Sequence, residues 1–373
     1  MPSLAINKDI AADDIMSVSD LKEGKIFMLT GKDGSQLVLK AESQVTGSRI
    51  KQAAPVVKAI DPSVKMKPLK PSEVSQLQQW LGQAAPVSQQ IANTAGTRNA
   101  PSLTTAQKDS INNLKAAVIK FGTAVDGRTS IAKMNSVQMS TLKVVLDLDS
   151  TPTDSDLLTE AEVTYSAFTK ALNEKGGLEM VGEILAGDWC IGNCDRFVVP
   201  KFTGKGRRQG LALQLYDAQG KAITGATGTP QYHDLNMILN VGNIILIDDN
   251  GHARLSMLDY MDPFSGFATE TKKTDLTRAM EVWPMQHLLV PNTRTSVAQF
   301  LAEDLAYLLH PLNSGSVHSW KRNVGGRSAY KRIDAGIVSG IKKIIHSMES
   351  RKKQGKLDPL GAYLLGKLKE AKL

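Results

Sequence analysis

The chain contains little cysteine and few aromatic residues: two of its 373 residues are cysteine, and 5% are Phe, Trp or Tyr. Cys190 and Cys194 are four positions apart, and no further Cys or His nearby has the spacing of a zinc ligand. A disulfide-stabilised secreted domain is therefore not expected. We expect two reduced thiols in a reducing compartment.

Long hydrophobic runs are also absent. No apolar run approaches the roughly 20 residues that a membrane-spanning helix requires. The N-terminus lacks the basic region and apolar core of a Sec signal peptide. We therefore expect a cytoplasmic protein without a transmembrane segment. The polar, Ser-containing first residues would also suit export into a host cell by a route other than Sec, as for a bacterial effector, which composition does not test.

The signatures of several enzyme classes are missing as well. The six histidines are scattered, without the H-E-x-x-H motif of zinc proteases, and no G-x-S-x-G motif of serine hydrolases occurs. The net charge is +8, with basic clusters at Lys201–Arg208, around Lys321–Arg332 and in the C-terminal tail. Such clusters attract phosphates or acidic surfaces. Because no basic stripe is interleaved with aromatic residues, nucleic-acid binding is not expected.

The first part of the chain has the pattern of a small β-rich region. Residues 1–20 are expected to be a flexible lead-in. Two apolar runs, Lys25–Thr30 and Ser35–Glu42, flank the turn signal Gly31–Gly34 and predict a β-hairpin whose second strand ends in Val38-Leu39-Lys40. Further patterns predict helices at Gly47–Ile60, Ser72–Gly82 and Thr105–Gly122, a short strand at Val64–Leu69, a linker at Gln83–Thr105 and a hinge strand at Met134–Leu148.

The rest of the chain is mostly helical. A buried helix is expected at Gly177–Ala186. Thr203–Tyr232 has the composition of an inserted segment, with a hairpin expected around LALQLYDAQGKAIT, residues 211–224. Further helices are expected at Asp154–Asn173, Asp275–Val282, Thr295–Leu309, Ala329–Ser350 and Pro359–Lys372. The expected organisation is an α+β, two-lobed fold resembling an atypical protein kinase. Residues 21–140 form a small β-rich N-lobe with a helical insertion, and residues 141–373 form a larger, mainly helical C-lobe with an insertion at 200–236.

Two stretches carry the chemistry. Gly187–Phe197 (GDWCIGNCDRF) is predicted to be a catalytic loop, and Asn240–Tyr260 contains two strands around a turn at Asp248–Gly251. Asn243 precedes the outgoing strand and Asp259 follows the returning one, so both should lie at the same end of the hairpin. Asn and Asp oxygens suit Mg²⁺, which takes one or two protein ligands together with phosphate and water.

Phosphoryl transfer needs a cation on the phosphates, metal ligands and a carboxylate near the attacking hydroxyl. Asp195 is the candidate for the carboxylate, and Arg196 could hold the loop by ion pairing or reach a phosphate. Asp188 and Asn193 could support the loop backbone. Lys40 could reach the phosphates from its strand. The structural alternatives are a polar helix-to-loop junction and, for Lys40, a surface lysine at a strand end.

The run DWCIGNCDRF, then GNIILID, then MLDY resembles the catalytic core of the actin-fragmin kinases. These are atypical kinases related to the phosphoinositide 3- and 4-kinases. The resemblance implies Asp195 as the catalytic Asp, Asn243 and Asp259 as metal ligands, and Lys40 as the lysine that contacts ATP. It also implies an enzyme that uses ATP with Mg²⁺ or Mn²⁺, a nucleotide in the cleft between the lobes, and transfer to a protein Ser or Thr.

The chain departs from this pattern in three ways. Asp195 and Asn243 are 243 − 195 = 48 positions apart, which requires an insertion. No G-x-G-x-x-G precedes Lys40, and the acidic partner of Lys40 is not evident; Glu42, Asp61 and Glu73 are the candidates, and Glu42 is the nearest in sequence. Two alternatives therefore stay open: a lipid kinase, and a catalytically inactive kinase-like interaction scaffold.

Overall fold

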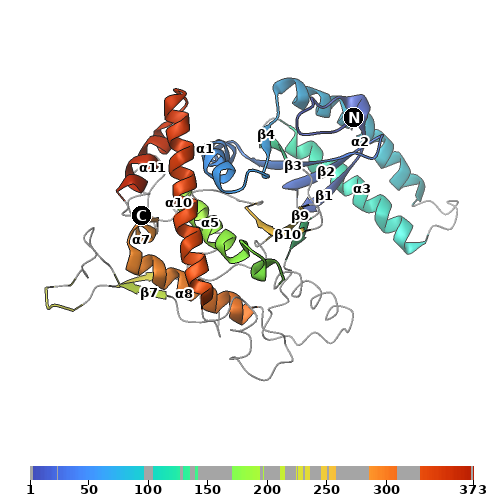
Figure 1. Cartoon of the computed structure of the whole chain (residues 1–373). Coiled ribbons are helices and arrows are strands. Elements are labelled where there is room, and N and C mark those ends of the chain that lie inside the picture. The colour runs from blue at the N-terminus through green and yellow to red at the C-terminus, as the bar shows by residue number, and fades with distance from the viewer. Residues whose placement is uncertain are drawn as a thin grey trace. The chain divides into compact units, whose positions relative to one another are not determined.

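The computed structural model (Figure 1) has mixed α and β structure, with small antiparallel sheets and mostly helices. It divides into two compact units, Met1–Lys51 with Ser63–Ser136, and Gln52–Pro62 with Val137–Leu373. Each unit is considered by itself. The structure describes residues 3–22, 24–95, 104–126, 129–134, 139–141, 170–193, 196, 211–214, 224, 226–229, 232–235, 245–249, 252–257, 285–308, 328–370 and 373.

The first unit contains a five-stranded antiparallel sheet with the order β1-β2-β3-β5-β4. The predicted hairpin is confirmed: β2 and β3 pair in register, with Phe27 opposite Leu39, and Gly34 in the connecting turn has φ +79°. That left-handed conformation favours glycine. The strands are β1 (Ile15–Lys22), β2 (Ile26–Gly31), β3 (Gln36–Ser43), β4 (Met66–Pro68) and β5 (Thr129–Met134).

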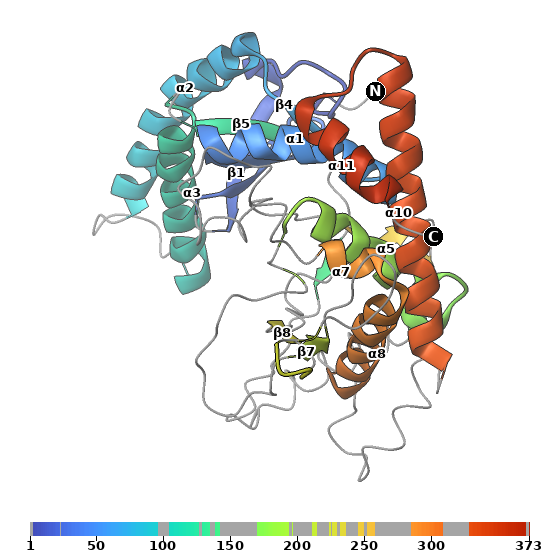
Figure 2. The same ribbon diagram turned by 90° about the vertical axis from the view of Figure 1, so that its left-hand side faces the viewer.

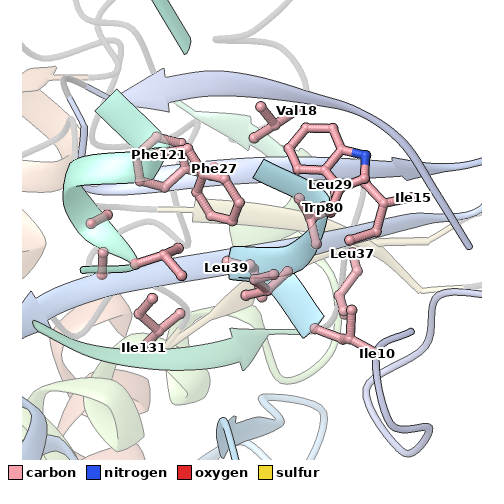
Figure 3. Packing of buried hydrophobic residues seen from close by; sticks show 14 of the residues in the cluster. Ile10, Ile15, Val18, Phe27, Leu29, Leu37, Leu39, Trp80, Phe121 and Ile131 are labelled. Carbon is pink, nitrogen blue, oxygen red and sulfur yellow. The ribbon is translucent and has the colours of Figure 1, made fainter. Parts of the chain in front are cut away.

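Helices α2 (Pro71–Ala95) and α3 (Thr105–Ala124) supply the other half of the core of this unit. Figure 3 shows apolar side chains of the sheet packed against both helices. The ring centroids of Phe27 and Phe121 are 5.0 Å apart, and Trp80 meets Phe121 edge-on at 6.4 Å. Alternating residues of β2 and β3 face this core, which is the pattern expected for a sheet covered on one side.

Two expectations for this unit are wrong. The first residues are part of the fold rather than a flexible lead-in: a 3-10 turn, η1 (Ala12–Asp14), precedes β1, and Leu4, Ile10, Ile15 and Val18 are buried in the core. The segment Gln83–Ala95, expected to be a linker, continues α2. Its alanines and glutamines are good helix formers, and their contribution outweighs the cost of Pro86.

Helix α1 (Gln44–Ile60) begins three residues before its predicted start and contains Pro55. Its second half belongs to the second unit, where Ala53, Val56, Val57 and Ile60 are buried. The other helices that the structure describes in that unit are α5 (Gly177–Cys190), α7 (Met285–Leu289), α8 (Pro291–Leu308), α10 (Ala329–Lys353) and α11 (Pro359–Lys369). The patterns at 295–309, 329–350 and 359–372 thus predicted three helices correctly, and Asp275–Val282 lies outside the described residues.

Helix α10 is the central element of the second unit and packs against α5, α8 and α11, as Figure 1 and Figure 2 show. The contact with α5 is unusually close because glycines line it. A Cβ atom on Gly336 would lie 2.0 Å from the carbonyl oxygen of Glu179, and one on Gly182 would lie 2.0 Å from that of Ile333. The two backbones can approach this far only without side chains.

Among its described residues, the second unit also contains two small sheets. One has the order β10-β9-β6, and the predicted hairpin between β9 and β10 is present. Asp248 and Asp249, however, belong to β9 rather than to the turn. The other sheet contains the first strand of the hairpin expected at 211–224, but that strand pairs with residues 232–235. Most of the expected return strand lies outside the described residues. The strands are β6 (Met139–Thr141), β9 (Ile245–Asp249), β10 (His252–Ser256), β7 (Leu211–Gln214) and β8 (Tyr232–Leu235).

Among the helices that the structure describes, none has the combination of length and hydropathy that crossing a bilayer demands. Of the hinge strand expected at Met134–Leu148, the structure describes Met134, which ends β5, and β6. Most of the helix expected at Asp154–Asn173 also lies outside the described residues.

Candidate active site

The predicted catalytic loop begins later than expected because α5 continues to Cys190. Gly192, two residues after the end of the helix, has a left-handed φ of +62°, and the Asn193 N–H donates to the carbonyl oxygen of Asp188 at 2.8 Å. This is the hydrogen bond of a Schellman motif, in which a glycine reverses the chain after the last helical turn. The motif brings Asn193 back beside Asp188.

The carboxylate of Asp188 is the centre of a buried polar network. The Asn193 amide donates to its Oδ1 at 2.8 Å, and Arg196 Nε donates to its Oδ2 at 2.7 Å. All three side chains are buried, with exposed fractions of 1% or less. Buried charges are stable only when they are paired and hydrogen-bonded, so this arrangement fixes the chain on both sides of Asp195.

A second carboxylate, that of Asp61 at the end of α1, holds the end of β10. Ser256 Oγ donates to Asp61 Oδ2 at 2.5 Å, and the Met257 N–H donates to the same oxygen at 3.1 Å. Arg254 Nη1 lies 3.3 Å from Oδ1. Asp61 is fully buried, so these donors offset the loss of its hydration.

Met257 connects the two networks. Its N–H is bound by Asp61, and its carbonyl oxygen accepts from Arg196 Nη2 at 3.4 Å. Arg196 directly follows Asp195 in sequence, and Met257 is two residues before Asp259. The structure therefore brings together the segments that lead into two of the predicted site residues, although they are far apart in the sequence.

Lys40 lies on β3, in the first unit. Its Nζ is 3.6 Å from Glu42 Oε1, and its side chain is only 1% exposed. The strand does not end at Lys40 but continues to Ser43, so Lys40 and Glu42 are on the same face two residues apart. A surface lysine at a strand end is thus excluded. An ammonium group so far removed from water needs a counter-charge, and Glu42 provides one.

The other two candidate partners of Lys40 have different roles. Glu73 Oε1 accepts from Lys133 Nζ at 2.6 Å and from the Ile10 N–H at 3.1 Å. Lys133 is opposite Leu39 in the sheet and so lies on the other face from Lys40. This buried pair attaches the N-terminal segment to α2. Asp61 binds the end of β10, as described above.

Three predicted site residues, Asp195, Asn243 and Asp259, lie outside the described residues, as does Cys194. Within the part of the chain that the structure describes, no three His, Cys, Asp or Glu side chains are grouped as metal ligands. Cys190 is a free, buried thiol on α5, and burial raises its pKa to about 12. It is not a partner in a disulfide.

Sequence reasoning missed the structural role of Asp61 and the contribution of Arg254, Ser256 and Met257. Asp61 follows the last apolar residue of a helix, where a carboxylate has no local signature. A partial signal was present, because a small polar residue at 256 interrupts the apolar pattern just before Asp259. Comparisons with protein-family models, with curated proteins and with solved structures give no match for this chain.

Proposed function

We propose that the protein is an ATP- and Mg²⁺-dependent kinase of atypical two-lobed fold that transfers phosphate to a protein Ser or Thr hydroxyl. The observation that supports this proposal best is that the backbone of Met257 is hydrogen-bonded on both sides. Its N–H donates to Asp61, and its carbonyl oxygen accepts from Arg196. It supports an active site because the loop around Asp195 and the strand before Asp259 are fixed to one another by buried charges. A surface loop and a surface hairpin would not need such an arrangement.

The side chains available fit the chemistry. Asp195 would orient the acceptor hydroxyl and receive its proton, while Lys40, whose Nζ lies 3.6 Å from Glu42, would bind the nucleotide phosphates. The amide oxygen of Asn243 and the carboxylate of Asp259 are the hard oxygen donors that Mg²⁺ prefers. The bound metal would neutralise charge that develops on the phosphates during transfer. Arg196 and Asp188 would position the loop rather than react.

The test is phosphate transfer from labelled ATP to proteins of a cell lysate, with Mg²⁺ or Mn²⁺. We expect transfer by the wild type and loss of at least about a hundredfold in Asp195→Ala, the range typical for a group that handles a reacting proton. Asp249→Ala is the matched control, because Asp249 pairs with His252 at the turn end of the same hairpin. Transfer by a folded Asp195→Ala protein at the wild-type rate would contradict the proposal.

The burial of Lys40 favours a second candidate, an interaction scaffold without catalytic activity. Its side chain is 1% exposed, and that of Glu42 is 14% exposed, so a phosphate could reach the ammonium group only if the atoms around it moved. The scaffold predicts that wild-type and Lys40→Ala proteins behave alike towards ATP. The kinase predicts weaker ATP binding in Lys40→Ala, and isothermal titration with ATP and Mg²⁺ separates the two.

A further inference from the structure

A groove of about 910 Å³ lies between the second half of α1 and one face of α10, both in the second unit. The residues that α10 contributes recur every three or four positions, so they form a single stripe along the helix. The polar and basic members of the stripe include Ser339, Lys342, Lys343, His346, Ser347 and Arg351. Helix α1 adds Lys58 opposite.

The groove is positively charged. Four of its lining residues carry a permanent positive charge, and none of its lining residues is acidic: the basic ones are Lys58, Lys342, Lys343 and Arg351. Lys343 is compensated by Glu183 at 2.7 Å. Within the described part of the chain, Lys58 and Lys342 are exposed and have no carboxylate partner. Basic side chains facing one concave space attract an anion and raise its local concentration.

Arg351 gives a second, independent indication. Its carboxylate contact, to Asp358, is long at 4.0 Å, and its Nη2 donates to the carbonyl oxygen of Lys356. Its Nε–H is buried, and no acceptor for it occurs among the described residues. A buried donor without a partner costs free energy. Because the rest of the Arg351 side chain is one third exposed, an ion or water can reach the guanidinium and satisfy such a donor.

We propose that this groove binds a compact ligand that carries several phosphate groups, either as a free molecule or as the headgroup of a lipid. The volume lies within the range of sites for small molecules. From Lys342 to Arg351 the helix advances nine residues, or about 14 Å, which one phosphate group does not span. Serine hydroxyls between the basic residues are the further donors that phosphate oxygens require. The inference is independent of the proposed kinase activity.

The test is isothermal titration of the full-length protein with inositol hexakisphosphate, a soluble compact polyphosphate. The variant is Lys58→Gln with Lys342→Gln, which removes two exposed charges from the groove. The matched control is Lys331→Gln with Lys352→Gln, two exposed lysines of α10 that do not line the groove. We expect at least about a tenfold rise in the dissociation constant in the groove variant and little change in the control.

A second experiment, on binding to lipid vesicles, distinguishes a lipid headgroup from a free ligand as the carrier of the phosphate groups. Vesicles that contain a phosphoinositide are compared with phosphatidylserine vesicles of equal charge. Phosphoinositide-selective capture that the groove variant loses indicates a lipid headgroup, whereas binding of the soluble probe alone indicates a free ligand. Polyglutamate of equal charge is the remaining control, because equal affinity for it would show that phosphate is not recognised.

Glu183→Gln should lower the dissociation constant for the probe, whereas the groove variant should raise it. The substitution keeps the shape of the side chain and an acceptor for Ser339 Oγ, which now donates at 2.7 Å, but it releases Lys343 from its ion pair. We expect the probe to bind more tightly. The proposal is overturned if neither probe nor vesicles bind, if both double variants lose binding equally, or if Glu183→Gln weakens binding in a folded protein.

Discussion

Asp188 shows how one side chain can organise a loop. It lies on the last turn of α5, fully buried, and accepts hydrogen bonds from Asn193 and Arg196. All three residues lie in one short run of the sequence, which predicted that Asp188 and Asn193 support the loop and that Arg196 holds the loop by ion pairing or reaches a phosphate. It could not show that Arg196 also reaches Met257, because that contact joins residues 61 positions apart.

We predict that Asp188→Ala destabilises the protein by about 3–5 kcal/mol, because it leaves the Arg196 guanidinium buried without its counter-charge. Urea unfolding measures the change. The control is Asp9→Ala, which removes an ion pair with Lys70 in which both side chains are about 60% exposed, and which should leave the midpoint almost unchanged. A small effect of Asp188→Ala would mean that water enters and solvates Arg196.

The Cys190 thiol should be inert in the native protein. Burial raises its pKa from 9.0 to about 12, so the thiolate that reacts is suppressed. In a Cys194→Ser background, we expect no reaction with a thiol reagent at about pH 8 until the protein unfolds. Rapid labelling of the folded protein would contradict the burial of this residue.

The same shift predicts a dependence of stability on pH. Above the unfolded pKa of 9.0 the unfolded chain loses the thiol proton while the folded chain keeps it. The free energy of unfolding should therefore fall as pH rises from about 9 towards 12. The difference between this protein and its Cys190→Ala variant isolates the effect from the titration of lysines and tyrosines.

At the scale of elements, the glycine contact between α5 and α10 determines how closely these helices pack. Ridges of side chains normally keep helix axes 8–10 Å apart. At Gly182 and Gly336 no side chain intervenes, and an added Cβ atom would lie 2.0 Å from a backbone carbonyl oxygen of the facing helix. The helix that carries Asp188 is thereby held against α10, the longest helix described in the unit.

We predict that Gly336→Ala destabilises the protein by about 3 kcal/mol or more, since the new methyl group would lie 2.0 Å from the carbonyl oxygen of Glu179 and the helices must separate. Gly366→Ala on α11 is the control, because nothing lies within 4 Å of its added Cβ. There we expect a gain of about 0.5–1 kcal/mol from the reduced flexibility of the unfolded chain. Thermal and urea unfolding of both variants provide the comparison.

The accuracy of the sequence-based predictions differs between local and long-range features. Regular apolar spacing placed the starts of α10 and α11 at Ala329 and Pro359, where the structure has them, and an Asp-Gly pair located the turn between β2 and β3. Pairings between distant residues have no such pattern. The hydrogen bond between Asp61 and Met257 joins residues 196 positions apart in the sequence, and the ion pair between Lys133 and Glu73 joins residues 60 positions apart. Buried ion pairs of this kind depend on the tertiary fold.

At the scale of the whole molecule, the kinase proposal makes a prediction about ligand-induced stability. A ligand that binds only the native state stabilises it by about 2.7 kcal/mol at 100 times its dissociation constant. ATP with Mg²⁺ should therefore raise the melting temperature of the wild type. Asp259→Ala should lose most of the Mg²⁺-dependent part, whereas Asp195→Ala should keep most of it, because the hydroxyl partner is not needed for binding.

Differential scanning fluorimetry with ATP alone, Mg²⁺ alone and both together tests this for the three proteins. A full Mg²⁺-dependent rise in Asp259→Ala would mean that the hairpin does not hold the metal. The absence of any rise in the wild type would favour the interaction scaffold.

The division of the chain into its two units has a consequence for synthesis on the ribosome. Gln52–Pro62 is made early, between two parts of the first unit, but it belongs to the second. The ion pair between Asp61 and Arg254 can form only after Arg254 has been synthesised, which is 254 − 61 = 193 residues after Asp61. At roughly 5–20 residues per second that delay is about 10–40 s. During this time the apolar face of α1 has emerged without its final partners, which makes the nascent chain a candidate for chaperone binding.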